Sequence, residues 1–505
     1  MTTHEMPDVI VVGAGQAALA AAMSALDSGA RVLVLEKSPA SERGGTTRFT
    51  GIYRFSYEGL DDLRALIPQM TDEEAAFIDV GQYTPDQFYN DMMRLSSERA
   101  DQAFTETFVS ESYAAIKWMV DSGVRWEIAG HLGKYIGGKL CFHKGTVSRP
   151  WGGGLELVNT MLSIIEKRGA RILYETKATK LLVTEGGKVR GVRVKDKTGF
   201  RDIECRSVVL ASGGFQANPE MRTKYLGSGW DVVKVRGTRY DTGEGLQMAL
   251  EIGAATTGQF SGSHATQVFA EGPDVEMGDL AFADAYTSGI LVNTLGKRFL
   301  DEGEDLATYT YAKFGRALLG QPGQLGFQIY DSKTINLLYH IDRYRLANPV
   351  VADTIEELAD GIDVDKETLV ETVNEYNAAC PDGYLDPDAF KAAFDAGVYN
   401  PSVVDGKSTT KGLWPKKSNW ASRIDLPPFY AYPVTCGITF TFGGLKTDTG
   451  ARVLDTEGNP IPGLYAAGEI VGNFYFNYCA GTGLTKGAVF GRIAGRNAAD
   501  EGGNQ

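Results

Sequence analysis

Short apolar runs recur along the chain, each bounded by glycine or polar residues. Residues 8–12 (DVIVV), 31–35 (RVLVL) and 207–210 (SVVL) are rich in β-branched residues, a pattern that predicts buried strands. The segment 464–469 (LYAAGE) repeats the pattern as a strand followed by a turn. Residues 19–28 have a helical composition and lie between the first two runs. The order strand, helix, strand predicts an α/β fold with a parallel sheet.

Longer segments predict what surrounds this sheet. Residues 60–130 are charged and rich in helix-forming residues, so we expect a helical insertion over the sheet. Residues 177–197 alternate apolar and polar positions around a Gly-Gly pair, which predicts two strands joined by a turn. Further helices are expected at 355–379 and 387–397.

Composition narrows the class of protein. The chain has 505 residues, a length that suits two or three domains, and a formal net charge of −14. That acidity argues against a nucleic-acid partner. No apolar run approaches the roughly 18 residues of a membrane span, and the first residues lack the pattern of a signal peptide. The five cysteines are far apart and have no metal-binding spacing, so we expect reduced thiols, no metal and a cytoplasmic location.

The strongest chemical signal is the turn after the first strand. Its sequence is Gly-Ala-Gly-Gln-Ala-Ala, a G-x-G-x-x-A pattern that opens the predicted helix. Gly13 permits the tight turn, Gly15 lets the backbone approach a pyrophosphate, and Ala18 allows close packing of the helix on the strand. The helix N-terminus presents free N–H groups to phosphate oxygens. Glu36 ends the second strand, where a carboxylate accepts hydrogen bonds from ribose hydroxyls and disfavours the 2′-phosphate of NADP.

Additional glycine-rich turns favour FAD over NAD. The pair Gly44-Gly45 follows shortly after Glu36, as a longer cofactor requires when the chain returns along the pyrophosphate. No second G-x-G-x-x-G with a trailing acid follows, so no NAD(P)H site is predicted. The predicted FAD contacts are Gly13, Ala14, Gly15, Ala17, Ala18, Glu36, Lys37, Gly44, Gly45, Thr46, Thr47, Ala178, Ala211, Ser212, Gly213, Gly214, Thr242, Gly243, Gly468, Glu469, Gly481, Gly483, Leu484 and Thr485.

Several blocks together resemble the flavoprotein family of fumarate reductase, succinate dehydrogenase and 3-ketosteroid Δ1-dehydrogenase. They are GAGQAA with the following acid, RGGTT, TGEG, GILVNTLGKRFLDE, GLYAAGEI and GAVFGRIAG. The resemblance covers most of the chain in the family's order. Within the family, the segments RGGTTRFT, RPWGGGLELV, DLATYTYAKFGR and PPFYAYPVTCGITFTFGG look most like tricarballylate dehydrogenase-like flavoproteins.

The resemblance implies a Rossmann-type FAD-binding domain with a β-meander, split by an inserted α+β cap. The FAD-binding domain is expected at 1–254 and 428–505 and the cap at 255–427, which makes the chain α+β overall. The substrate would lie between the two, against the isoalloxazine ring. The histidine that binds flavin covalently in the family would fall near Thr46 and is absent, so we expect non-covalent FAD.

Other departures from the family pattern concern the substrate side. Fumarate reductases carry an arginine proton donor where this chain has 309–311 (YTY), a histidine where it has Phe440, and an arginine near Tyr478. The stretch around His264 resembles a segment that carries a substrate-side histidine. The expected catalytic residues are Tyr311, Arg316, Tyr478 and His264, and the expected substrate-binding residues are Tyr309, Phe440 and His143.

These residue types suit oxidation or reduction of a carbon–carbon bond, which needs a flavin for the hydride and a protein group that holds the proton. The expected function is dehydrogenation of a CH–CH bond next to a carboxylate or carbonyl in a small organic substrate. Electrons would pass to an external acceptor, a separate electron-transfer protein or a quinone. The alternatives are an ene-reductase, a 3-ketosteroid dehydrogenase-type enzyme, a flavin oxidase and a flavin-binding protein without turnover. We expect a substrate that is bulkier or less charged than fumarate.

Overall fold

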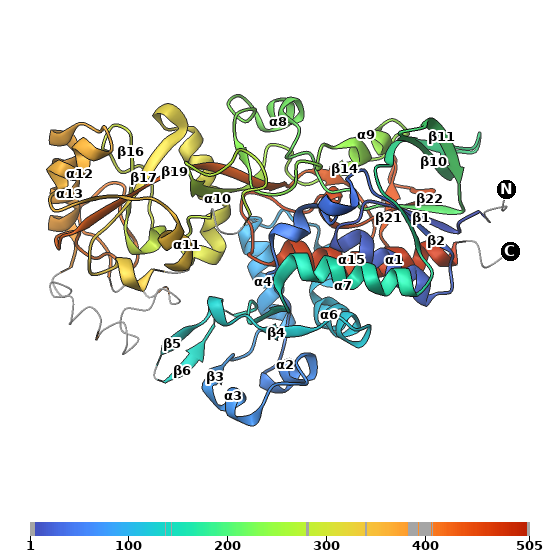
Figure 1. Cartoon of the computed structure of the whole chain (residues 1–505), viewed down its shortest axis with the longest axis horizontal. Coiled ribbons are helices and arrows are strands. Elements are labelled where there is room, and N and C mark those ends of the chain that lie inside the picture. The colour runs from blue at the N-terminus through green and yellow to red at the C-terminus, as the bar shows by residue number, and fades with distance from the viewer. Residues whose placement is uncertain are drawn as a thin grey trace.

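The computed structural model describes residues 6–136, 138–142, 144–278, 282–338, 341–381, 392, 404, 406 and 408–501. It places two six-stranded sheets toward opposite ends of an elongated molecule, and a helical lobe lies beside the first sheet (Figure 1). No helix among these residues is long and apolar enough to cross a membrane.

The first sheet is the predicted parallel sheet. Its order is β21–β22–β12–β1–β2–β8, and β21 alone pairs antiparallel. The strands are β1 (Val9–Val12), β2 (Val32–Leu35), β8 (Arg171–Leu173), β12 (Ser207–Leu210), β21 (Arg452–Leu454) and β22 (Pro460–Ala466). All residues of β1, β2 and β12 are buried, as expected for parallel strands covered on both faces. The apolar runs therefore predicted this sheet correctly.

Three helices and a small sheet cover this core. Helix α1 (Gln16–Asp27) packs against α15 (Thr482–Asp500) and α7 (Gly153–Lys167). Alanines of α1 face glycines of α15, which brings the two helices close together. Strands β9 (Lys177–Val183), β10 (Val189–Asp196) and β11 (Gly199–Glu204) form the antiparallel meander. The predicted α/β fold with a meander is therefore confirmed.

The segment 60–130 forms a helix-rich lobe, as predicted (Figure 1). Its helices are α2 (Leu60–Leu66), α3 (Asp72–Phe77), α4 (Pro85–Leu95), α5 (Gln102–Ser110) and α6 (Ser112–Asp121). Capping boxes begin α3 at Thr71 and α4 at Thr84. The short strands near this lobe are β3 (Ile78–Asp79), β4 (Trp126–Ile128), β5 (Lys134–Ile136), β6 (Lys139–Cys141) and β7 (Ser148–Pro150).

The second sheet belongs to the cap. It contains β13 (Lys234–Val235), β15 (Ser263–Phe269), β16 (Ile290–Asn293), β17 (Leu325–Tyr330), β18 (Val350–Ala352) and β19 (Phe429–Thr441). The cap helices are α10 (Ala307–Leu319), α11 (Ile341–Leu346), α12 (Ile355–Gly361) and α13 (Lys366–Ala379). Between the two sheets lie α8 (Pro219–Leu226), α9 (Glu244–Leu250), β14 (Thr256–Thr257) and β20 (Gly444–Leu445).

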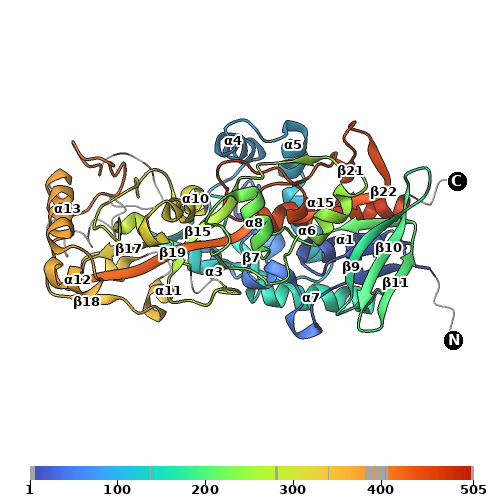
Figure 2. The same cartoon turned by 90° about the horizontal axis from the view of Figure 1, so that it is seen from above.

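One sequence prediction in the cap needs correction, and the domain boundary at 427/428 stays a prediction. Next to that boundary, residues 429–435 of β19 pair with β17 and β18 (Figure 2). The helix predicted over 355–379 is divided into α12 and α13, because Asp363 has a φ of 54° and the Asp365 side chain caps a new helix. The helix predicted at 387–397 lies outside the described residues.

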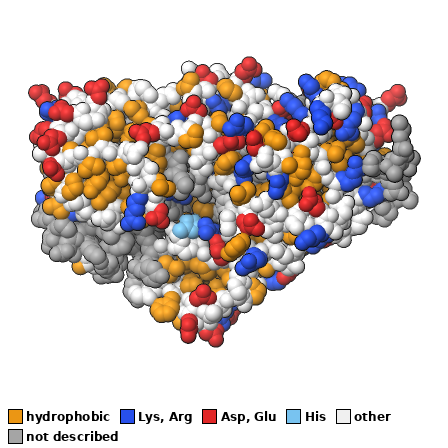
Figure 3. Space-filling view, viewed as in Figure 1, with side chains coloured by type: hydrophobic (Ala, Val, Ile, Leu, Met, Phe, Trp, Pro, Cys, Tyr) orange, Lys and Arg blue, Asp and Glu red, His pale blue; other side chains and the backbone are white. Residues whose placement is uncertain are grey.

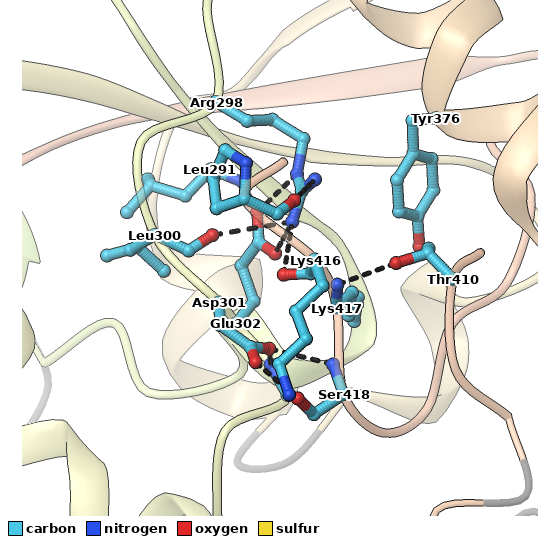
Figure 4. A network of polar contacts seen from close by, with 12 residues as sticks. Leu291, Arg298, Leu300, Asp301, Glu302, Tyr376, Thr410, Lys416, Lys417 and Ser418 are labelled. Atoms are coloured by element: carbon cyan, nitrogen blue, oxygen red, sulfur yellow. Dashed lines mark hydrogen bonds and ion pairs between the residues drawn. The ribbon is translucent and has the colours of Figure 1, made fainter. Parts of the chain in front are cut away.

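A buried ionic network fastens the segment 415–418 to the cap (Figure 4). Arg298 pairs with Glu302 and donates to the carbonyl of Pro415 at 2.6 Å. Lys417 donates to the carbonyl of Gly289 at 2.5 Å. Because every charge in this network has a partner, we assign it a structural role. On the outer face drawn in Figure 3, acidic and basic side chains are interspersed.

Candidate active site

The dinucleotide-binding turn lies at the carboxyl end of β1. Gly13 has a φ of 111°, and a Cβ at this position would clash with the backbone carbonyl of Ala211 on the next strand, so glycine is required. Helix α1 has Gly15 as its N-cap without a side-chain cap, which leaves N–H groups of its first turn available to a ligand. Glu36 is buried at the end of β2. The local geometry is that of a site for the phosphates and ribose of a dinucleotide.

A continuous cavity runs from this turn into the cap, because its lining includes both the glycine turn and the cap residues His264, Phe282 and Arg343. One cavity therefore joins the place for a dinucleotide to the cap. The predicted FAD contacts that line it are Gly13, Ala14, Gly15, Ala17, Glu36, Lys37, Gly45, Thr46, Thr47, Ala178, Ala211, Ser212, Gly213, Gly468, Glu469, Gly481, Gly483 and Leu484.

Six predicted contacts do not line the cavity, namely Ala18, Gly44, Gly214, Thr242, Gly243 and Thr485. Two of them, Thr242 and Thr485, hydrogen-bond to lining residues, and Thr485 does so by donating to the carbonyl of Gly481 at 3.2 Å. Ala18 is fully buried on the inner face of α1, and Thr242 accepts a hydrogen bond from Lys37. Thr485 accepts from the backbone N–H of Arg54 at 3.2 Å. A sequence motif includes residues that line the cavity and residues that do not, and their spacing in the sequence does not show which are which.

Two buried carboxylates lie beside Thr46 in the cavity. Gln216 donates to Asp241 at 2.6 Å and to Glu469 at 3.2 Å, and the Thr46 hydroxyl lies 2.7 Å from Asp241. Burial raises the pKa of Asp241 to about 7 and the pKa of Glu469 to about 8. Burial also lowers the pKa of nearby Lys486 to about 7. Burial therefore brings the pKa values of all three groups close to neutral pH.

Polar atoms without protein partners show that the cavity fits FAD. Gln16 Nε2, Thr439 Oγ1 and His264 Nδ1 belong to lining residues, are buried, and have no hydrogen-bond partner in the described part of the chain. Buried polar atoms normally have partners, so these are placed for a ligand. With the glycine turn and Glu36, the set suits a flavin dinucleotide, and the N-terminus of α15 at Gly481 would face its ring system.

Four residues expected on the substrate side meet at the cap end of the cavity. They are His264 on β15, Tyr311 on α10, Phe440 on β19 and Tyr478 before α15. The imidazole centroid lies 4.8 Å from the Tyr311 ring, 5.0 Å from the Phe440 ring and 4.8 Å from the Tyr478 ring. We call these four side chains the aromatic wall. Segments separated by more than 200 residues of sequence are thus brought together at one place.

Burial decides the protonation of this wall. It lowers the pKa of His264 well below its usual value, and the nearby charge of Arg236 acts in the same direction, so the imidazole is neutral. It raises the pKa of Tyr311 well above its usual value, so this phenol keeps its proton at neutral pH. The Tyr478 hydroxyl accepts a hydrogen bond from the Gly483 N–H at 2.8 Å. Burial also raises the pKa of Tyr478, so both phenols of the wall are protonated at neutral pH. The Tyr311 hydroxyl makes no hydrogen bond to the described part of the chain, so it can donate one to a ligand.

Four further residues at this end were missed from the sequence. Arg236, Phe282, Asp284 and Arg343 line the cavity beside the aromatic wall. Arg343 pairs with Asp284 at 3.0 Å. They lie in loops or in the short helix α11, where no motif or hydrophobic period marks them. Only the folded chain brings them to the cavity.

Three expected residues have other positions. Tyr309 does not line the cavity, and its hydroxyl donates to Asp91 at 2.7 Å. Arg316 does not line it either and donates to the carbonyl of Ser263 at 3.4 Å. Successive helical residues point about 100° apart, so both side chains leave α10 on other sides than Tyr311. His143 lies outside the described residues.

Comparisons with known proteins agree with this geometry. The chain is 30% identical to an NADH:acrylate oxidoreductase of Vibrio harveyi over 99% of its own length, and it spans about half of that relative (51%). The open conformation of a flavocytochrome c3 fumarate reductase has a TM-score of 0.73 and 26% identity, covering 99% of this chain and 79% of that one. The 3-ketosteroid-delta4-(5alpha)-dehydrogenase of Rhodococcus jostii RHA1 has a TM-score of 0.69 and 25% identity, covering 99% and 98%.

The family described as FAD binding domain matches residues 8–485, nearly the whole chain. That match spans the glycine turn, the meander, the cap and the start of α15. Together with the cavity, it establishes FAD as the cofactor, and the chain belongs to the FAD-binding-domain family of flavoproteins.

Proposed function

We propose that this protein is a FAD-dependent oxidoreductase that forms or reduces a carbon–carbon double bond next to a carboxylate or carbonyl in a small organic substrate. The observation that carries the proposal is the continuity of the cavity, which joins the dinucleotide turn to Tyr311, His264 and Arg236. The names of the similar proteins point the same way. Acrylate, fumarate and 4-androstene-3,17-dione all have a double bond next to a carboxylate or carbonyl.

The side chains at the cap end of the cavity have different roles in the proposed reaction. Dehydrogenation removes a hydride from one carbon and a proton from its neighbour, and reduction adds both. FAD, when bound, supplies the hydride chemistry. Tyr311 holds the proton at its hydroxyl, and neutral His264 hydrogen-bonds the substrate. The guanidinium groups of Arg236 and Arg343 attract the carboxylate or carbonyl oxygen and draw electron density from the double bond.

Further parts of the proposal concern the surroundings of the reaction. We expect non-covalent FAD, because Thr46 stands where the resemblance places the flavin-linked histidine. The chain has one dinucleotide motif, so the electron partner is proposed to be a separate protein or a quinone. The five cysteines are not joined in disulfides, which suits a reducing compartment such as the cytoplasm.

Anaerobic stopped-flow spectroscopy of the purified yellow protein tests this function. Oxidised enzyme is mixed with saturated acids and ketones, and dithionite-reduced enzyme with their unsaturated partners, while the visible flavin band is followed. Bleaching by a saturated compound supports a dehydrogenase, and rapid reoxidation by an unsaturated compound supports a reductase. A flavin that responds to neither group of compounds would overturn the proposal and favour a flavin-binding protein without turnover.

A further inference from the structure

A buried arginine lies directly behind the cavity wall at the N-terminus of α15. The side chain of Arg54 is 0% exposed, and its Nε donates to the carbonyl of Ala480 at 2.7 Å. Ala480 and Gly481 line the cavity, whereas Arg54 does not. The guanidinium group therefore contacts the cavity wall from behind. No step of the proposed reaction uses this residue.

The backbone fixes Arg54 against the same turn. Its N–H donates to the carbonyl of Gly481 at 3.1 Å and to the Thr485 hydroxyl at 3.2 Å. A Cβ on Gly481 would lie 2.8 Å from the Arg54 nitrogen, so only glycine allows this close approach. On the other side of the guanidinium, Nη1 donates to the carbonyl of Lys144 at 2.7 Å. These contacts hold the charge at one place beside the start of α15.

The side chains around the guanidinium are neutral. Its carbon lies 5.4 Å from the ring centroids of both Tyr83 and Tyr309. Burial raises the pKa of both phenols above the usual value and raises the pKa of the Cys479 thiol to about 12, so all three groups keep their protons at neutral pH. An arginine in a protein always keeps its charge. In the described part of the chain, no carboxylate forms an ion pair with Arg54.

One carboxylate lies beyond the two phenols. Tyr83 and Tyr309 donate to Asp91 at 2.8 Å and 2.7 Å. Asp91 also lies 3.7 Å from the guanidinium of Arg94, whose side chain is 52% exposed. Asp91 therefore has a cation of its own, and the two phenols stand between it and Arg54. A buried charge without a counter-charge destabilises a fold, so we expect the counter-charge of Arg54 to come from the cavity side.

We infer that Arg54 is a positioning residue that raises the reduction potential of bound FAD by stabilising the negative charge of the reduced flavin. Uptake of two electrons and one proton leaves the flavin as an anion, with its charge at the N1–O2 edge of the ring system, and a second proton makes it neutral. The positive end of the α15 dipole and the Arg54 guanidinium lie at the same part of the cavity wall, so their effects on this anion add. The inference goes beyond the proposed function, because it requires bound FAD and no particular substrate.

Reductive titration of the holoenzyme with dithionite, beside a dye of known potential, tests this inference without a substrate. Arg54→Met removes the charge and keeps a long side chain, whereas Arg54→Lys keeps the charge. Arg54→Met should lower the equilibrium constant for two-electron reduction by about 10- to 100-fold, the effect of one charge at about 6–10 Å with an effective dielectric constant near 20. This change corresponds to about 30–60 mV, at about 30 mV for each factor of ten. Arg54→Lys should recover at least half of the shift.

The pH dependence of the potential is a second measurement, and it needs no variant. The slope of potential against pH gives the number of protons taken up with the two electrons. In the wild-type enzyme, uptake of one proton should extend at least about one pH unit below the range seen for free FAD, because a tenfold stabilisation of the anion shifts its pKa by about one unit. The matched control is Arg48→Met, which removes a partly exposed charge from the same segment and should change the equilibrium constant by less than about 2-fold.

Three results overturn the inference: an unchanged potential in Arg54→Met, equal losses in Arg54→Met and Arg54→Lys, or a wild-type reduced flavin that takes up its second proton at the same pH as free FAD. Where Arg54→Met does not fold, the wild-type pH profile decides. The proposed function survives these results as long as an unsaturated compound reoxidises the reduced flavin. It fails by itself if the potential depends on Arg54 as expected and no unsaturated compound accepts electrons.

Discussion

Replacing Tyr311 with phenylalanine tests proton transfer at this site most directly. The substitution removes one hydroxyl and keeps the ring, which lies 4.8 Å from His264 and 5.2 Å from Phe282 between centroids. Burial keeps the phenol protonated at neutral pH by raising the pKa of Tyr311 well above its usual value. The variant therefore lacks the proton while the shape of the cavity is preserved.

The expected effect on rate is large and the effect on stability small. A positioned acid or base contributes about 10²–10⁴-fold to rate, which corresponds to about 2.7–5.4 kcal/mol of activation free energy. The Tyr311 hydroxyl makes no hydrogen bond to the described part of the chain, so the free energy of unfolding should change by less than about 1 kcal/mol. The rate is measured as single-turnover reoxidation of the reduced holoenzyme by the unsaturated compound that reacts in the stopped-flow experiment. The free energy of unfolding is measured by urea denaturation.

Tyr309 provides the matched control on the same helix. Its hydroxyl donates to Asp91 at 2.7 Å, outside the cavity. Tyr309→Phe should leave the reoxidation rate within about 3-fold, because no group at the reacting carbons changes. It should cost about 0.5–1.5 kcal/mol of stability, because Asp91 loses one hydrogen bond and keeps the one from Tyr83 at 2.8 Å. A Tyr311→Phe enzyme that reacts at nearly the wild-type rate would refute the assignment of the proton to Tyr311, and a slow Tyr309→Phe enzyme would restore Tyr309 to the site.

Three other outcomes follow from the cofactor part of the cavity. Gly13→Ala should weaken FAD binding, measured by flavin fluorescence, by more than about 100-fold, because the added Cβ would clash with the backbone of Ala211. The control is Gly29→Ala, where φ is also positive but the surrounding space is open. It should leave FAD affinity unchanged and lose only about 1–2 kcal/mol of stability. Burial raises the pKa of Glu469 to about 8, so the folded carboxyl keeps a proton that the unfolded chain releases near pH 4.5, and native stability falls as pH rises between these values. Glu469→Gln removes this loss, so its stability relative to wild type, measured by urea denaturation of the apoprotein, should increase from about pH 6 to pH 9; a constant difference would contradict the burial argument. Acid precipitation should release all FAD into the supernatant, and flavin that remains with the protein would disprove non-covalent binding.

The sequence alone determined the dinucleotide half of this protein, because that half is governed by local rules. Runs such as 9–12 and 208–210 are apolar at every position and therefore form strands covered on both faces. Gly13 has a φ of 111°, a conformation that favours glycine, and its place directly after an apolar run marks this turn in the sequence. The strand, turn, helix and acid all fall within one βαβ unit, so a short stretch of sequence contains the complete signal.

Tertiary structure decided the substrate half. Both Tyr309 and Tyr311 were reasonable expectations, and the orientation of α10 in the cap selects Tyr311, since neighbouring helical positions point in different directions. The pairing of β19 with β15 and β17 joins residues that are at least 100 positions apart in sequence, which the alternation of apolar residues in each strand does not reveal. Arg236 and Arg343 carry no sequence signal: they lie more than 100 residues apart in a loop and a short helix. Only the folding of the chain around the second sheet, which β13 joins through β19, brings their guanidinium groups beside Phe282.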